Sequence, residues 1–139
     1  WEKLKLKEGK KSVLEGVPKG LPAMVKASRV QDKAKGVGFD WEQPEQVWEK
    51  VQEELQELQE EVATGDLDRI ESEFGDVLFS MINYARFLNV NPEDALERTN
   101  KKFIHRFQYL ESKVNAMGKS LADMTLAEMD VYWNEAKKI

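Results

Sequence analysis

Residues 45–63 of this 139-residue chain read EQVWEKVQEELQELQEEVA, and their apolar side chains recur at a helical interval. These side chains belong to Val47, Val51, Leu55, Leu58 and Val62. Their steps of 4, 4, 3 and 4 residues follow the period of an α-helix and leave the opposite face to glutamate and glutamine. The stretch therefore predicts an amphipathic helix that buries one face against a neighbour.

A second helix is predicted directly after the first. Thr64-Gly65-Asp66 ends the first helix, and the Asp66 side chain can cap the next one. Residues 67–88, LDRIESEFGDVLFSMINYARFL, again have apolar side chains at helical spacing. The predicted core face consists of Leu67, Ile70, Phe74, Val77, Leu78, Met81, Ala85 and Leu88. Because the link is short, we expect the two helices to form an antiparallel hairpin.

Three more helices are predicted, over residues 22–35, 92–117 and 125–138. A proline opens each of the first two, and Thr125 with Glu128 forms a capping box for the last.

The whole chain is therefore expected to be an all-α antiparallel helical bundle. Residues 1–20 contain several glycine and proline breaks and are predicted to be an irregular arm. We expect a single domain over residues 1–139, with the bundle over residues 21–138.

Composition excludes several classes of site. The chain has no cysteine and one histidine, His105, which rules out disulfides, thiolate zinc sites and histidine-rich metal sites. Hydrophobic residues make up 41% and charged residues 34%, and no apolar run is long enough to span a bilayer, so we expect a cytoplasmic location without membrane contact. The net charge of −5 disfavours binding to a nucleic-acid polymer.

Two pairs of carboxylates, each spaced three residues apart, decide the functional prediction. Glu54 and Glu57 lie on the first helix of the hairpin, and Glu73 and Asp76 lie on the second. Residues i and i+3 share a helix face, so the hairpin can bring both pairs to the edge of the core. Four carboxylates that close cannot all stay ionised without a cation between them. Oxygen ligands suit Mg²⁺ first and Mn²⁺ second, and such a site suits hydrolysis of a phosphoric anhydride.

A solvated helix face is the competing interpretation of these acids. Glu53 and Glu60 point away from the apolar stripe, and Arg69 lies four residues before Glu73 and could simply pair with it. Past Asp76, the same strip of the second helix carries Ser80, Asn83 and Phe87 and no basic residue. Gly75 costs about 1 kcal/mol relative to alanine inside a helix, which suggests that something approaches closely there. From the residues alone, both interpretations stay open.

The order Glu-Glu-x-x-Glu at residues 53–57, a spacer of 15 residues and Glu-x-x-Asp at residues 73–76 resembles the metal signature of the MazG family of all-α nucleoside triphosphate pyrophosphatases. The resemblance extends across nearly the whole chain and is strongest to the C-terminal domain of MazG proteins. Its further segments are GVPKGLPA (16–23), VGFDW (37–41), EFGDVLF (73–79), NYAR (83–86), NKKFIHRF (100–107) and MDVYWNEAK (129–137). The resemblance implies a MazG-like helical bundle that assembles as a homodimer.

The resemblance also implies an activity and a metal. The expected reaction is hydrolysis of NTPs or dNTPs to the monophosphate plus pyrophosphate, by metal-activated water attacking the α-phosphorus. By position, Glu54, Glu57, Glu73 and Asp76 match the ligands of Mg²⁺, for which Mn²⁺ could substitute. Glu53 matches the first acid of the motif and is expected to help orient water or ligands.

A set of substrate-binding residues follows from the same resemblance. Its members are Lys102, Arg106, Asn83, Asn100, Trp133 and Lys137. Lys102 and Arg106 lie one helical turn apart and suit contact with phosphates, and the Trp133 indole could stack on a base. Without the resemblance, the basic pair would be an ordinary surface pair and Trp133 an ordinary core residue.

One departure from the family pattern concerns Ser72. Relatives often have an acid just before the residue that matches Glu73, so the serine puts any accessory metal ligand in question, whereas the main site is expected to persist. His105 is expected to be solvated or at the core edge, not a catalytic base. A single acidic constellation implies a single-domain protein or the C-terminal half of a longer one.

Two alternatives stay open from sequence. The first is a narrower member of the same superfamily, such as a dUTP, dCTP or phosphoribosyl-ATP pyrophosphohydrolase. The second is a non-catalytic helical dimerisation module, which predicts neither a Mg²⁺ effect on stability nor release of pyrophosphate.

Overall fold

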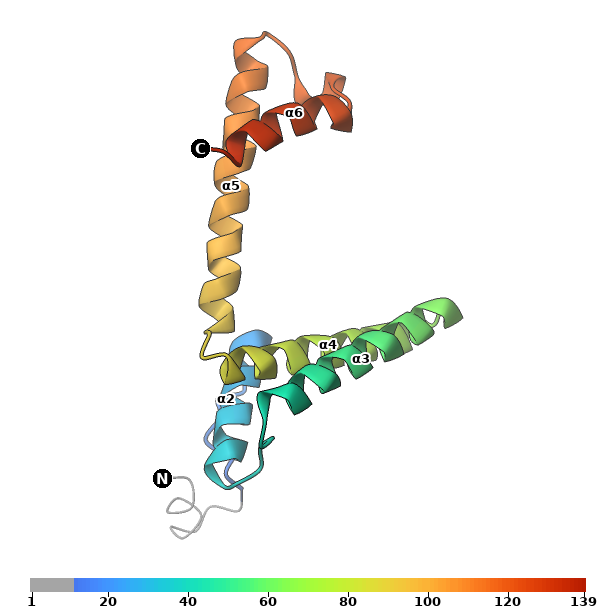
Figure 1. Ribbon diagram of the computed structural model, residues 1–139, viewed down its shortest axis with the longest axis vertical. Coiled ribbons are helices and arrows are strands. Elements are labelled where there is room, and N and C mark those ends of the chain that lie inside the picture. The colour runs from blue at the N-terminus through green and yellow to red at the C-terminus, as the bar shows by residue number, and fades with distance from the viewer. Residues whose placement is uncertain (1–11) are drawn as a thin grey trace. The chain divides into compact units, whose positions relative to one another are not determined.

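The computed structural model describes residues 12–139, and their regular structure is helical throughout (Figure 1). The α-helices are α2 (Ala23–Gly36), α3 (Pro44–Thr64), α4 (Leu67–Phe87), α5 (Pro92–Ala116) and α6 (Leu126–Ala136), and the 3-10 helix η1 (Leu121–Asp123) precedes α6. No β-strand occurs between residues 12 and 139, which confirms the predicted all-α class for this part of the chain. Within that range, no helix is both long and apolar enough to cross a membrane.

The chain divides into two compact units, the first ending at Glu93 and the second running from Asp94 to Ile139. Helices α2, α3 and α4 belong to the first unit, whereas η1, α6 and nearly all of α5 belong to the second. Residues 12–20 of the predicted irregular arm form turns without a helix, and residues 1–11 lie outside the described residues. The predicted single bundle over residues 21–138 stays a prediction.

Helices α3 and α4 form an antiparallel hairpin whose ends are set by local sequence signals (Figure 1). Pro44 occupies the first position of α3, and Gly65 ends that helix in the left-handed region at φ 74°. The Asp66 carboxylate then accepts hydrogen bonds from the backbone N–H groups of Asp68 at 3.1 Å and Arg69 at 3.3 Å. These caps satisfy backbone groups that the helix itself leaves free. The predicted bounds of both helices are confirmed to within one residue at each end.

The first unit buries a narrow seam instead of the full apolar faces of its helices. Its buried apolar residues are Val47, Val51, Val77 and Ile82. Several predicted core residues are instead at least 41% exposed, namely Leu55, Val62, Leu67, Phe74, Leu78, Met81 and Leu88. The core prediction was wrong for these residues, because α3 packs mainly on α4, and α4 packs mainly on α3 and α2. The apolar faces are therefore wider than the neighbouring helices can cover.

Two sets of polar contacts attach α2 and the following loop to α4. Gln31 Nε2 on α2 donates a hydrogen bond to the backbone carbonyl of Phe79 at 3.0 Å. From α4, Arg86 donates two hydrogen bonds to the Asp40 carboxylate, at 2.8 and 3.2 Å, and a third to Asn83 Oδ1 at 2.6 Å. The loop between α2 and α3 is thereby fixed against the C-terminal half of α4.

The second unit is held by contacts between the C-terminal half of α5 and α6. Leu110, Val114 and Ala136 are buried there. The Tyr109 hydroxyl donates a hydrogen bond to Glu135 Oε2 at 3.0 Å. The predicted capping box between Thr125 and Glu128 is present at the start of α6, a further sequence signal that the structure confirms.

Candidate metal centre

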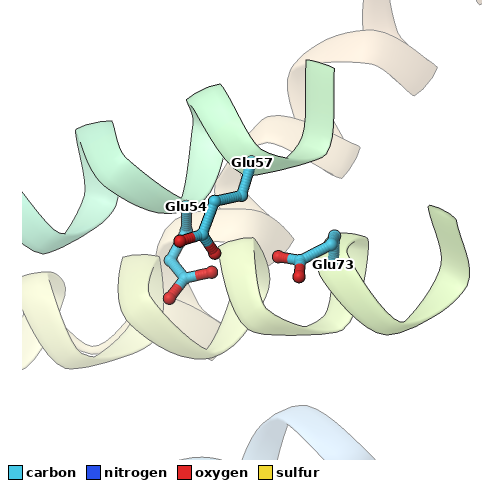
Figure 2. Close-up of side chains that lie close together, drawn as sticks. All are labelled: Glu54, Glu57 and Glu73. Carbon is cyan, nitrogen blue, oxygen red and sulfur yellow. The ribbon is translucent and has the colours of Figure 1, made fainter. Parts of the chain in front are cut away.

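Three of the five predicted catalytic carboxylates come together across the hairpin (Figure 2). Glu54 and Glu57 lie one turn apart on α3, and Glu73 faces them from α4. One carboxylate oxygen from each residue lies within 4.8 Å of the other two, close enough for the three to hold a metal ion. Glu54 is only 6% exposed whereas Glu53 is exposed, as their positions relative to the apolar stripe predict. We call Glu54, Glu57 and Glu73 the carboxylate cluster.

The electrostatics of the carboxylate cluster are uneven. Lys50 Nζ lies 2.9 Å from Glu54 Oε1, and this hydrogen bond lowers the pKa of Glu54 against the opposing effect of burial. The negative charge of Glu54 is the main cause that raises the pKa of Glu57. Burial raises the pKa of Glu73, and the charges of Glu57, Asp76 and Glu54 add to the effect. Two of the three carboxylates therefore have a raised pKa, because one lysine does not neutralise three acids.

Two buried oxygens of the carboxylate cluster have no hydrogen-bond partner in the described part of the chain, which makes the cluster suitable for a cation. Glu54 Oε2 and Glu73 Oε2 are buried, and neither has a hydrogen-bond partner among residues 12–139. A buried polar atom without a partner costs free energy, and a divalent cation would remove that cost by direct coordination. Glu61 Oε2 is in the same state, although Glu61 is not one of the three residues whose oxygens converge. An all-oxygen donor set suits a hard ion such as Mg²⁺ or Mn²⁺.

The other two predicted catalytic acids lie beside the cluster. Asp76 is exposed and its oxygens are outside the group that converges within 4.8 Å, but its charge is close enough to raise the pKa of Glu73. Glu53 is exposed and has an oxygen 3.4 Å from Lys50 Nζ. At Gly75, an added Cβ would meet no atom of the described chain within 4 Å apart from the nearby backbone of its own helix and its two chain neighbours. The close approach expected at this glycine is therefore not found within residues 12–139.

Most of the predicted substrate-binding residues lie in the second unit. Lys102, Arg106 and Lys137 line an open cavity of about 640 Å³, whose wall also includes Arg98 and His105. Trp133 packs against Phe103 with ring centroids 5.1 Å apart. Asn100 is exposed on α5. Basic residues outnumber the two acidic residues of the lining, Asp94 and Glu97, which suits an anionic ligand such as a phosphate chain.

Asn83 lies in the first unit, on the wall of a largely apolar cavity of about 480 Å³. The aromatic side chains of Phe39, Trp41 and Phe79 line the same cavity, as does the Asp40–Arg86 ion pair. Asn83 lies seven residues after Asp76, so it is two turns farther along nearly the same face of α4. The structure thus places Asn83 beside the aromatic loop rather than beside the converging carboxylates.

Sequence reasoning missed two features of the first unit. Lys50 was not assigned a role, although it precedes Glu54 by four residues, the spacing at which helical side chains pair. Gln31 was also unassigned; it is buried, and its Oε1 has no hydrogen-bond partner in the described part of the chain. No sequence pattern distinguishes Gln31 from the other polar residues of α2, because its burial depends on the packing against α4.

Comparisons with known proteins relate most of this chain to one family of sequences. Residues 42–110 match the family model of the MazG nucleotide pyrophosphohydrolase domain, a range that includes the carboxylate cluster and most of α5. The chain is 44% identical over 140 residues to the nucleoside triphosphate pyrophosphohydrolase/pyrophosphatase MazG of Thermotoga maritima, in a match that covers 99% of this chain and 54% of that protein.

Two further relatives show the same pattern. The chain is 36% identical over 144 residues to the nucleoside triphosphate pyrophosphohydrolase of Escherichia coli, covering 99% of this chain and 55% of that protein. It is 47% identical over 142 residues to the uncharacterized protein YabN of Bacillus subtilis, covering 99% of this chain and 29% of that protein. The chain thus spans about half the length of the first two of these relatives and less of the third.

Proposed function

The chain belongs to the MazG family of nucleotide pyrophosphohydrolases, and we propose that it hydrolyses nucleoside triphosphates to the monophosphate and pyrophosphate. The observation that carries this proposal is the carboxylate cluster, in which oxygens from Glu54, Glu57 and Glu73 converge within 4.8 Å. In the reaction, a water oxygen forms a bond to the α-phosphorus. The bond from that phosphorus to the oxygen bridging to the β-phosphorus breaks, and this oxygen leaves with pyrophosphate.

The resident metal in this proposal is Mg²⁺, with Mn²⁺ as a substitute. Glu54, Glu57, Glu73 and Asp76 would hold it, and when bound it supplies positive charge to phosphate oxygens and acidity to a bound water. The two buried carboxylate oxygens without partners, on Glu54 and Glu73, support this assignment. Glu53 is exposed beside the cluster, where its carboxylate can orient water.

Six residues are proposed to bind the substrate, and each is assigned from the unit in which it lies. Lys102, Arg106 and Lys137 would bind the phosphate chain, because they place three cations on one cavity wall. Asn83, Asn100 and Trp133 would contact the nucleoside. For Trp133 this role is compatible with its intermediate exposure, which leaves part of the indole accessible for stacking.

A homodimer is the proposed assembly. The exposed apolar residues of α4 include Phe74, Leu78, Phe79 and Met81, and α5 adds Phe103, Ile104 and Phe107. Each of these two helices thus has several exposed large apolar side chains, and clusters of such side chains mark interaction sites in soluble proteins. Light scattering coupled to gel filtration should give twice the chain mass of 16.1 kDa, and the mass of a single chain would contradict the proposal.

Product analysis tests the proposed reaction. The protein is incubated with a panel of ribo- and deoxyribonucleoside triphosphates and Mg²⁺, and the products are separated by chromatography. Monophosphate plus pyrophosphate is expected, whereas diphosphate plus inorganic phosphate would overturn the proposal. Activity toward only one nucleotide of the panel would instead favour a narrower pyrophosphohydrolase, and no turnover with any nucleotide would favour a non-catalytic module.

A further inference from the structure

Lys50 is the cation closest to the carboxylate cluster in the described structure. Lys50 lies one turn before Glu54 on α3. Its ammonium nitrogen is 2.9 Å from Glu54 Oε1 and 3.4 Å from Glu53 Oε1. The Glu54 side chain is 8% exposed, while that of Lys50 is 38% exposed. The lysine therefore reaches from a part-exposed position toward a nearly buried carboxylate.

The contact with Lys50 satisfies only part of the negative charge. It occupies Oε1 of Glu54, while Oε2 of the same residue has no hydrogen-bond partner among residues 12–139. Glu57 and Glu73 bring two more carboxylates to the same place, and no ion pair joins either of them to a cation of the described chain. A divalent cation would neutralise all three acids better than one ammonium group does.

We propose that Lys50 is a tethered counter-cation of the carboxylate cluster, whose ammonium neutralises Glu54 while no metal is bound and must leave Glu54 when a divalent cation binds. The inference rests on the proposed metal site and specifies how that site is regulated. An ammonium at 2.9 Å from Glu54 Oε1 competes for the same carboxylate and repels an ion bound to it. Lys50 therefore stabilises the metal-free hairpin and weakens metal binding by the same interaction.

Metal titration without nucleotide tests this role, because it involves no turnover. Binding of Mn²⁺ is followed by the spectroscopic signal of the free ion in the wild type, Lys50→Met, Lys50→Arg and Arg29→Met. Lys50→Met keeps the aliphatic stem and removes the charge, and Lys50→Arg restores the charge. Arg29 is an exposed residue of α2, so Arg29→Met is a control with the same change in net charge.

Lys50→Met is expected to bind Mn²⁺ on the order of three- to tenfold more tightly than the wild type. The variant removes one positive charge that repels the ion, and the effect is modest because solvent partly screens the part-exposed Lys50–Glu54 pair. Lys50→Arg and Arg29→Met should bind like the wild type. The melting temperature of Lys50→Met should be lower than that of the wild type without metal, and saturating Mn²⁺ should close the gap. If Lys50→Met does not fold, Lys50→Gln takes its place in the same titration.

The outcomes separate this inference from the metal site itself. Wild-type protein that binds no Mn²⁺ would overturn both. Wild-type protein that binds Mn²⁺ while Lys50→Met binds it equally or more weakly would overturn the role of Lys50 alone. In that second case, weaker nucleotide binding by Lys50→Met would assign the lysine to the substrate phosphates instead.

Discussion

Replacing Arg86 by methionine should destabilise the first unit by about 2–3 kcal/mol, because it leaves a nearly buried carboxylate without its partner. Arg86 donates to both oxygens of Asp40, at 2.8 and 3.2 Å, and each side chain of this pair is 15% exposed. Exposed ion pairs contribute at most about 1 kcal/mol, and breaking a fully buried one costs about 3–5 kcal/mol. The observed exposure places this pair between those limits.

The appropriate assay is a double-mutant cycle of Arg86→Met and Asp40→Asn, measured by urea unfolding near neutral pH. We expect a coupling free energy of about 2 kcal/mol between Arg86 and Asp40, typical of charge-assisted hydrogen bonds in a bidentate pair. The hydrogen bond from Arg86 to Asn83 contributes to the single Arg86→Met change but cancels from the cycle. A coupling below about 0.5 kcal/mol would refute the reasoning, since it would mean that solvent screens the pair as it screens exposed ones.

The same pair predicts a dependence on pH. Burial raises the pKa of Asp40, but the hydrogen bond from Arg86, with the Trp41 backbone N–H and the Arg86 charge, outweighs it and lowers the pKa below the ordinary 3.8. The folded state therefore releases this proton more readily than the unfolded state, so the stabilisation is fully present above 3.8 and is lost as the pH falls through the folded pKa. The difference between wild type and Arg86→Met should shrink over that acidic range.

Four further predictions concern the carboxylate cluster and its helices. Glu57→Gln and Asp76→Asn should each abolish pyrophosphate release while circular dichroism shows unchanged helicity, and full activity in either would remove that residue from the metal site. Because the pKa values of Glu57 and Glu73 are raised above 4.5, protons compete with metal, so Mn²⁺ affinity should fall as the pH is lowered toward that value, and constant affinity would contradict the geometry. For the same reason these two groups make the metal-free protein less stable as the pH rises from 4.5 through their folded pKa values, an effect that saturating metal should remove in urea titrations. Gly75→Ala should raise the free energy of unfolding by about 1 kcal/mol, because the added Cβ meets no atom of the described chain within 4 Å apart from the nearby backbone of its own helix and its two chain neighbours, and a loss of stability would reveal a close neighbour from a second copy.

The bounds of α3 and α4 could be predicted closely because short-range signals set them. Apolar periodicity, Pro44 at the first position of α3, Gly65 in the left-handed region and the Asp66 cap all act within a few residues of the chain. The burial of Glu54 relative to Glu53 followed from the same helical geometry. The helix bounds depend on residues close together in the chain, and the burial of Glu54 depends on the direction in which its side chain leaves the helix. Both follow directly from the sequence.

The extent of the core could not be predicted in the same way. Periodicity assigned Phe74, Leu78 and Met81 to the core face of α4, but all three are exposed in the first unit. A helical period shows which side of a helix is apolar, not how much of that side a neighbour covers. Gln31 shows the converse, because a polar residue is buried where α2 crosses α4.

The sequence by itself determined that this chain is helical, that two acid pairs lie on adjacent helices, and that its motifs resemble those of MazG proteins, since all of these follow from residue order and spacing. Only the tertiary structure decided that Glu54, Glu57 and Glu73 converge while Asp76 stays exposed at their edge. The reason is physical: the rotation and offset of one helix against another are set by packing between residues distant in sequence, and carboxylate separations of a few ångströms depend on both.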